Sequence, residues 1–104
     1  MFGLFKKEET IDENIAEGFM VLYGKHLELM NEIGQDRMMA YQFSKGENVF
    51  DNYEAAAEFS AHIVTVAKAL NGELKGLTNR HVVEGISMLH EEIKMEEKWL
   101  AENN

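Results

Sequence analysis

Apolar residues recur at intervals of three and four along most of the chain, and this spacing predicts amphipathic helices. The first such stretch runs from about Thr10 to Ser44, with its polar residues on the opposite face. Its apolar stripe consists of Ile11, Ile15, Phe19, Leu22, Tyr23, Leu29, Met30, Ile33, Ala40 and Tyr41. Thr10 and Glu13 have the spacing of a capping box, in which each side chain binds the other residue's backbone amide. We therefore expect a long helix that begins at Thr10.

Glycines provide the main stops because the sequence contains no proline. Gly46 ends the first apolar stripe. A second helix is expected from about Asn48 to Leu70, and the dipeptide Asn71-Gly72 ends it, since glycine suits the left-handed position after a helix. The expected buried arc of this helix is Val49, Tyr53, Ala56, Ala57, Ser60, Ile63, Val64 and Ala67.

A third helix begins at Thr78 or Asn79, both good N-caps, and continues to about Glu102. One of its stripes is an ordinary core face, made of Val82, Val83, Ile86, Leu89, Ile93 and Leu100. A second stripe lies nearly opposite and consists of His81, Met88, Met95 and Trp99. A helix that is apolar on two sides needs partners on two sides. These patterns predict an all-α fold, with three long helices in an antiparallel bundle.

The unequal helix lengths predict self-association. At 1.5 Å per residue the first helix would be about 50 Å long and the other two about 35 Å. A second helix folded back from Gly46 would reach only the level of Tyr23. Either the first helix breaks at a glycine and folds back, or a second chain covers the overhang; the candidate breaks are Gly18, Gly24 and Gly34. A homodimer is the economical solution. The expected interface residues are Ile11, Ile15, Phe19, Leu22, Met88, Met95 and Trp99.

Composition restricts the class of protein. The 104 residues suffice for one domain, expected at 10–104, and the hydrophobic content of 45% is ordinary for a globular chain. The net charge of −9 repels nucleic acid and anionic lipid, so the expected partners are proteins, cations or small molecules. The chain contains no cysteine, which excludes disulfides and thiolate chemistry and fits a cytoplasmic location.

The first residues form a short apolar segment with Phe2, Leu4 and Phe5, followed by two lysines. This segment is far shorter than the roughly 20 residues that span a bilayer, so we expect no stable membrane insertion. It also lacks the charge order of a signal peptide. We interpret residues 1–9 as a flexible arm. A weak anchor to a membrane or a partner stays an alternative.

Histidine and arginine provide the best candidates for a polar site. His26 and Arg37 project into the apolar stripe of the first helix, and His90 projects among the core residues of the third. If the first and third helices run parallel, Arg37 lies level with His90 and one turn from Glu97. The cluster predicts a structural ion pair with a core histidine. The alternative is a small pocket for an anionic ligand, to which the Arg37 guanidinium would donate two parallel hydrogen bonds.

No pattern commits the chain to catalysis, to a metal or to a cofactor. No histidine follows a glutamate by three residues, as a carboxylate-bridged di-iron bundle requires, and no His-Glu-x-x-His occurs. The leading hypothesis is a non-enzymatic helical bundle that acts through self-association and protein contacts, as an adaptor or regulatory subunit. The alternative is a ligand-binding or metal-binding bundle, possibly enzymatic, whose site is His26, Arg37, His90 and Glu97.

Overall fold

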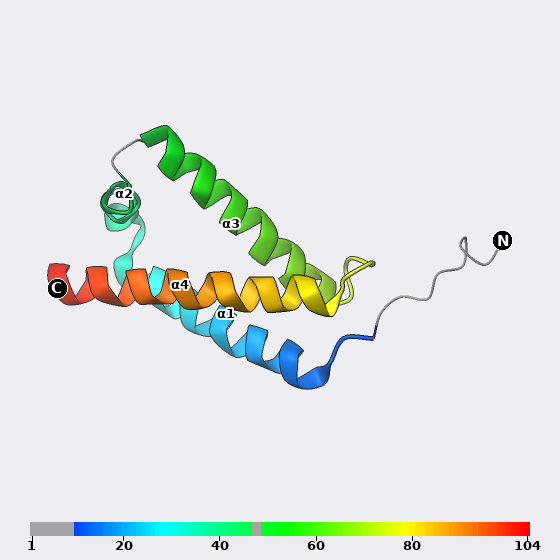
Figure 1. The fold of residues 1–104 in the computed structure, drawn as a ribbon. Coiled ribbons are helices and arrows are strands. Elements are labelled where there is room, and N and C mark those ends of the chain that lie inside the picture. The colour runs from blue at the N-terminus through cyan, green and yellow to red at the C-terminus, as the bar shows by residue number, and fades with distance from the viewer. Residues whose placement is uncertain (1–9, 47–48) are drawn as a thin grey trace.

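The computed structural model describes residues 10–46 and 49–104, and their regular structure is entirely helical. Four helices are present: α1 (Glu13–Ile33), α2 (Gln35–Ser44), α3 (Val49–Leu70) and α4 (Asn79–Asn103) (Figure 1). The predicted all-α class is confirmed, but the predicted count of three helices is wrong. The expected arm at residues 1–9 and the expected first residue of the second helix, Asn48, lie outside the described residues.

Gly34 divides the predicted first helix into α1 and α2. Its φ of 82° and ψ of 156° lie in a region that is essentially restricted to glycine. Its backbone N–H still donates to the Met30 carbonyl and closes the last turn of α1. Of the three candidate breaks, Gly34 is therefore the one used. After it, the chain turns and α2 crosses the end of α4 that carries the C-terminus.

The predicted capping box at Thr10 and Glu13 is wrong, because Asp12 is the N-cap of α1. One oxygen of the Asp12 carboxylate accepts from the backbone N–H groups of Asn14 at 2.8 Å and Ile15 at 3.3 Å. A carboxylate at this position also interacts favourably with the helix dipole. The Asn79 side chain accepts from the Asp12 N–H and donates to the Thr10 carbonyl, which fixes the entering chain to the start of α4.

The end of α3 and the beginning of α4 agree with the prediction from the sequence. Thr78 caps α4 as expected, and its hydroxyl accepts from the His81 N–H while the His81 imidazole accepts from the Thr78 N–H. This is a capping box in which histidine replaces the usual glutamate. At the end of α3, Gly72 has a φ of 83°, the left-handed conformation predicted for it.

Helices α1 and α4 run parallel and form the central seam of the fold. Gly18 faces Ile86 near the beginning of both helices, and His26 faces Glu96 farther along. At Gly85 the seam is especially close, because a Cβ there would lie 2.8 Å from the Phe19 ring. Helix α3 runs antiparallel to this pair and meets α4 near the connecting turn. Figure 1 shows α3 diverging from α4 toward α2.

The core draws on all four helices. Its buried apolar residues are Phe19, Leu29, Ile33, Tyr41, Ile63, Val66, Ala67, Val82, Leu89, Ile93, Trp99 and Leu100. Four residues predicted on the core faces of α3 and α4 are exposed instead: Ala57, Ser60, Val64 to 42% and Val83 to 49%. The side chains of Val49 and Tyr53, which were also predicted in the core, lie outside the described part of the chain. On α3, Val66 takes the buried place expected of Val64. The hydrophobic period was correct, but the rotation of these two helices about their axes differs from the prediction.

The overhang that motivated the predicted dimer does not exist in this chain. Phe19 is fully buried, and Ile11, Ile15 and Leu22 pack against the core. The prediction considered only α3 as a cover, whereas α4 lies along α1 from its first turn. Trp99 is covered too, because the Tyr41 ring packs edge-on against it, with 5.9 Å between ring centroids.

None of the described helices is both long and apolar enough to cross a membrane.

Replacing Gly34 by alanine should destabilise the fold. The positive φ and a contact of 2.8 Å between the new Cβ and an Asp36 carboxylate oxygen both oppose the substitution. The expected loss in the free energy of unfolding is about 1–3 kcal/mol. Gly24 is the matched control: it lies within α1 with open space around it, so Gly24→Ala should add about 0.5–1 kcal/mol. Urea unfolding followed by circular dichroism measures both. Equal effects of the two substitutions would contradict this explanation of the break.

Candidate functional site: a buried polar cluster between four helices

Two acidic side chains on α4 lie inside the protein. Glu92 is 6% exposed and Glu96 is fully buried, and they are one helical turn apart on the same face. An isolated buried carboxylate costs several kcal/mol, so each requires a partner. The partners come from different helices.

Glu92 is held by Tyr41 of α2 and by Lys45, the residue that caps the end of α2. The Tyr41 hydroxyl donates to Glu92 Oε2 at 2.6 Å, and Lys45 Nζ lies 2.8 Å from both carboxylate oxygens. Tyr41 and Lys45 are four residues apart and share one face of their helix. The Lys45 ammonium also lies over the Tyr41 ring, 4.9 Å from its centroid. The turn at Gly34 directs this face toward α4.

Glu96 is paired with His26 of α1. The imidazole Nδ1 lies 3.1 Å from Glu96 Oε1 and 2.9 Å from Oε2, and only the contact to Oε1 has hydrogen-bond geometry. Because Nδ1 carries at most one hydrogen, it can serve only one of these oxygens well, and we assign the hydrogen bond to Oε1. The His26 ring is nearly enclosed and packs edge-on against Phe59 of α3.

A small cavity lies beside these groups. It has a volume of about 40 Å³, and its walls include His26, Gln42, Phe59, Ser60 and Glu96, so all four helices contribute. Two buried oxygens among the described residues have no hydrogen-bond partner, and both belong to these walls: Gln42 Oε1 and Glu96 Oε2. Both oxygens are acceptors.

Burial governs the protonation of this cluster. Desolvation raises the pKa of Glu96, and the hydrogen bond and charge of His26 oppose this rise only in part. Burial also raises the pKa of Tyr41 well above its usual range, and the neighbouring carboxylate of Glu92 adds to the shift. Tyr41 therefore stays a neutral hydrogen-bond donor at any physiological pH.

Arg37 does not join this cluster, which corrects the predicted pairing with Glu97. Its guanidinium donates to the backbone carbonyls of Glu32 and Ile33, both at 2.8 Å, and to the Asn104 side chain at 3.1 Å. The end of α1 at Gly34 leaves carbonyls without helical partners, and Arg37 satisfies them. It also lies over the Trp99 ring, 5.2 Å from the centroid.

The two predicted site residues of α4 are at the surface. His90 is exposed, and Glu97 is half exposed and pairs with Lys25 at 3.3 Å. Of the four predicted residues, only His26 lies in the polar cluster. Glu92 and Glu96 were missed, although they continue the core spacing of Leu89 and Ile93. A glutamate at a core position of a helix was the signal that could have identified them.

Two larger openings flank α3. A groove of about 530 Å³ lies between α3 and α4, with Phe59, Met88 and Met95 among its walls and Lys45 and Glu92 beside the polar cluster. We call it the methionine groove. It contains two of the predicted interface residues, Met88 and Met95, whereas Trp99 is covered by its own chain.

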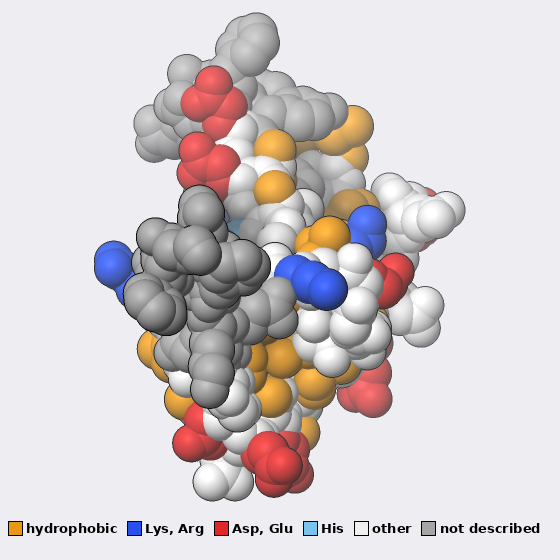
Figure 2. Space-filling view, turned by 90° about the vertical axis from the view of Figure 1, so that its right-hand side faces the viewer, with side chains coloured by type: hydrophobic (Ala, Val, Ile, Leu, Met, Phe, Trp, Pro, Cys, Tyr) orange, Lys and Arg blue, Asp and Glu red, His pale blue; other side chains and the backbone are white. Residues whose placement is uncertain are grey.

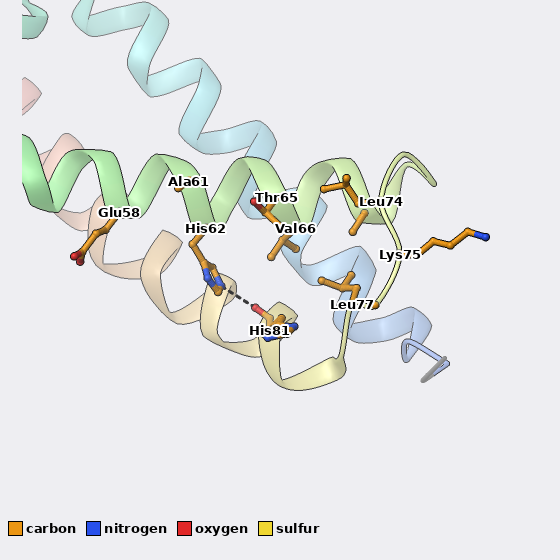
Figure 3. Close-up of a pocket in the computed structure, with 11 residues that line it drawn as sticks. Glu58, Ala61, His62, Thr65, Val66, Leu74, Lys75, Leu77 and His81 are labelled. Carbon is orange, nitrogen blue, oxygen red and sulfur yellow. Dashed lines mark hydrogen bonds between the residues drawn. The ribbon is translucent and has the colours of Figure 1, made fainter. Parts of the chain in front are cut away.

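A second opening, of about 620 Å³, lies near the turn between α3 and α4. Figure 3 shows His62 of α3 directed toward the start of α4, where its Nε2 lies 3.0 Å from the His81 carbonyl oxygen. His62 thus ties α3 to α4 at this end. In Figure 2, which looks toward this end of the molecule, hydrophobic side chains reach the surface beside both acidic and basic groups.

The fold and the cluster define an all-α helical bundle with a buried network of polar side chains. Comparison with protein-family models, with curated proteins and with solved structures finds no match in any of the three. Within residues 10–46 and 49–104, no three His, Cys, Asp or Glu side chains are grouped so that they could hold a metal ion. Function is therefore inferred from this chain's own contacts.

Glu96→Gln should change how stability depends on pH. A carboxyl whose pKa is raised by folding supports stability at acidic pH, and this support is lost as pH rises through the folded-state pKa. The stability of the glutamine variant relative to the natural protein should therefore increase from about pH 4.5 toward neutrality. Glu97→Gln, at the half-exposed neighbouring position, should show no such trend. Urea unfolding across this pH range in sodium buffer tests the difference. Parallel pH profiles for the two variants would exclude a shifted pKa at Glu96.

Tyr41→Phe should destabilise the protein by about 1–3 kcal/mol, because it leaves the buried Glu92 carboxylate without one of its donors. Tyr23→Phe removes the same phenol oxygen from a half-buried ring that stacks on Phe19, and it should have little effect. Thermal unfolding of both variants measures the difference. If Tyr23→Phe proved as costly as Tyr41→Phe, the hydrogen bond to Glu92 would not be the cause.

Proposed function

We propose that this chain is a non-enzymatic helical-bundle protein that acts through self-association and contacts with other proteins, as an adaptor or regulatory subunit. The observation that carries the proposal is the methionine groove between α3 and α4. Its volume of about 530 Å³ suits an apolar stretch of polypeptide, whereas the cavity of about 40 Å³ at the polar cluster is too small for an organic substrate. The cytoplasm is the proposed location.

The side chains of the groove support recognition of a helix. Met88 is half-buried and Met95 is 39% exposed, and Phe59 adds an aromatic wall. Methionine is unbranched and adapts its shape to a partner, which is why helix-binding grooves use it. Apolar side chains that stay accessible in a groove favour association because binding removes them from water.

The proposed occupant is α3 of a second copy. The exposed side of this helix carries the small residues Ala57 and Ala61, which permit close approach of another helix, together with Val64 at 42% exposure. Because α3 also forms one wall of the groove, a two-fold axis lets each copy contribute the same helix to the other's groove. Such an arrangement closes on itself as a dimer. Nucleic acid is not a proposed partner, given the net charge of −9.

Met95→Glu should weaken self-association because it places a charge in the apolar groove. The natural chain should sediment as a dimer at micromolar concentration, and Met95→Glu should shift it toward monomer with unchanged helix content. Met39→Glu is the matched control, because Met39 is 56% exposed on α2 and lies outside the groove. Sedimentation equilibrium together with circular dichroism provides the measurement. A monomeric natural chain, or equal effects of both substitutions, would overturn the proposal.

A further inference from the structure

We propose that the small cavity lined by the four helices is a binding site for one small monovalent cation that donates hydrogen bonds, with ammonium as its ligand. The proposal does not depend on the methionine groove having a protein partner. It rests on two buried oxygens that lack hydrogen-bond donors, on the charge of the cluster and on the volume of the cavity.

The walls of the cavity contain acceptors that lack donors. Glu96 Oε2 and Gln42 Oε1 are buried and have no hydrogen-bond partner among the described residues. Tyr41 and Lys45 both donate to Glu92, and His26 Nδ1 serves Glu96 Oε1, so none of these three side chains donates to the two oxygens. A buried acceptor without a donor is costly, so a bound species that supplies hydrogens to both oxygens is favoured.

Charge favours a cation over water. Lys45 balances Glu92, but when His26 is neutral nothing balances Glu96, and the cluster then has one excess negative charge. Glu96 is fully buried, so solvent does not compensate for that charge. The same burial raises the pKa of Glu96. A water molecule would supply hydrogens but no charge.

The nature of the walls favours ammonium. The cavity of about 40 Å³ exceeds the roughly 10–15 Å³ that one water-sized ligand needs, so a small ion has room in it. Ammonium has this size and can donate to Glu96 Oε2, to Gln42 Oε1 and to the Ser60 hydroxyl, while the Phe59 ring offers a cation–π contact. An alkali ion prefers a shell of oxygens. This cavity instead includes the sulfur-bearing side chains of Met30 and Met38 in its walls.

The ligand has a route to the site. Lys45, Phe59 and Glu92 belong both to the cavity and to the methionine groove. The Lys45 side chain is 14% exposed and lies at this boundary. A small ion can therefore enter along the groove and pass beside Lys45 without unfolding of α1 or α4.

The test compares ions by thermal unfolding of the full chain, at about pH 8, where an ordinary imidazole is neutral. Ammonium chloride should raise the unfolding midpoint in a saturable manner. Potassium chloride and tetramethylammonium chloride at equal ionic strength should give smaller shifts that do not saturate. Equal shifts for ammonium and potassium would overturn the proposal, because they would reflect ionic strength alone.

Variants locate the effect. Glu96→Gln and Gln42→Met each remove one of the two acceptors and should abolish the ammonium-specific shift. Glu97→Gln should retain it. If Glu96→Gln does not fold, Gln42→Met provides the test, because Gln42 is only half-buried. Loss of the shift in Glu97→Gln, or its persistence in Gln42→Met, would place ammonium elsewhere and contradict the site.

Spectroscopy separates ammonium from a proton. With ¹⁵N-labelled ammonium, bound-ion protons should show nuclear Overhauser contacts to the Phe59 ring. Infrared spectra at the same pH should show Glu96 as a carboxylate. A carboxylic-acid band that disappears in Glu96→Gln would mean that a proton neutralises Glu96, and the ammonium site would be rejected.

Discussion

The two buried carboxylates of α4 impose the main constraint on this fold. Glu92 and Glu96 lie on the face that packs against the other helices, and each would cost several kcal/mol without a partner. His26 provides the partner from α1, and Tyr41 of α2 and the following Lys45 provide the other. Apolar packing tolerates small shifts of one helix along another, whereas these contacts do not. These polar contacts therefore fix the register of α1 and the position of α2 relative to α4.

Gly34 makes this arrangement possible. A continuous helix through this position would carry Tyr41 and Lys45 away along the axis of α1, and Glu92 would lose both donors. The break has its own cost, since it leaves carbonyls at the end of α1 without helical partners. Arg37 offsets that cost by donating to two of them. Gly34 and Arg37 thus set the direction in which α2 leaves α1. This direction brings Tyr41 and Lys45 to Glu92.

Much of the architecture could be predicted from the sequence. The hydrophobic period identified the helical class, the stops after Leu70 and before Asn79, and the burial of His26, because these depend on local spacing and capping. The polar cluster could not be predicted in full. Glu96 and Glu97 differ by about 100° around a helix axis, and a pattern of apolar residues does not fix its rotation that finely. Glu92 and Glu96 also resembled the solvated acidic residues of an amphipathic helix. Their burial depends on partners that are far away in sequence.

The covering of Trp99 has a practical consequence. The chain has one tryptophan, and the two groups placed against its indole, the Arg37 guanidinium and the Tyr41 ring, both belong to α2. Undocking of α2 would remove a cation and an aromatic ring from the indole's surroundings and admit water in their place. The fluorescence of Trp99 therefore reports the position of α2, and changes in its emission can measure the rate at which α2 undocks without any attached label.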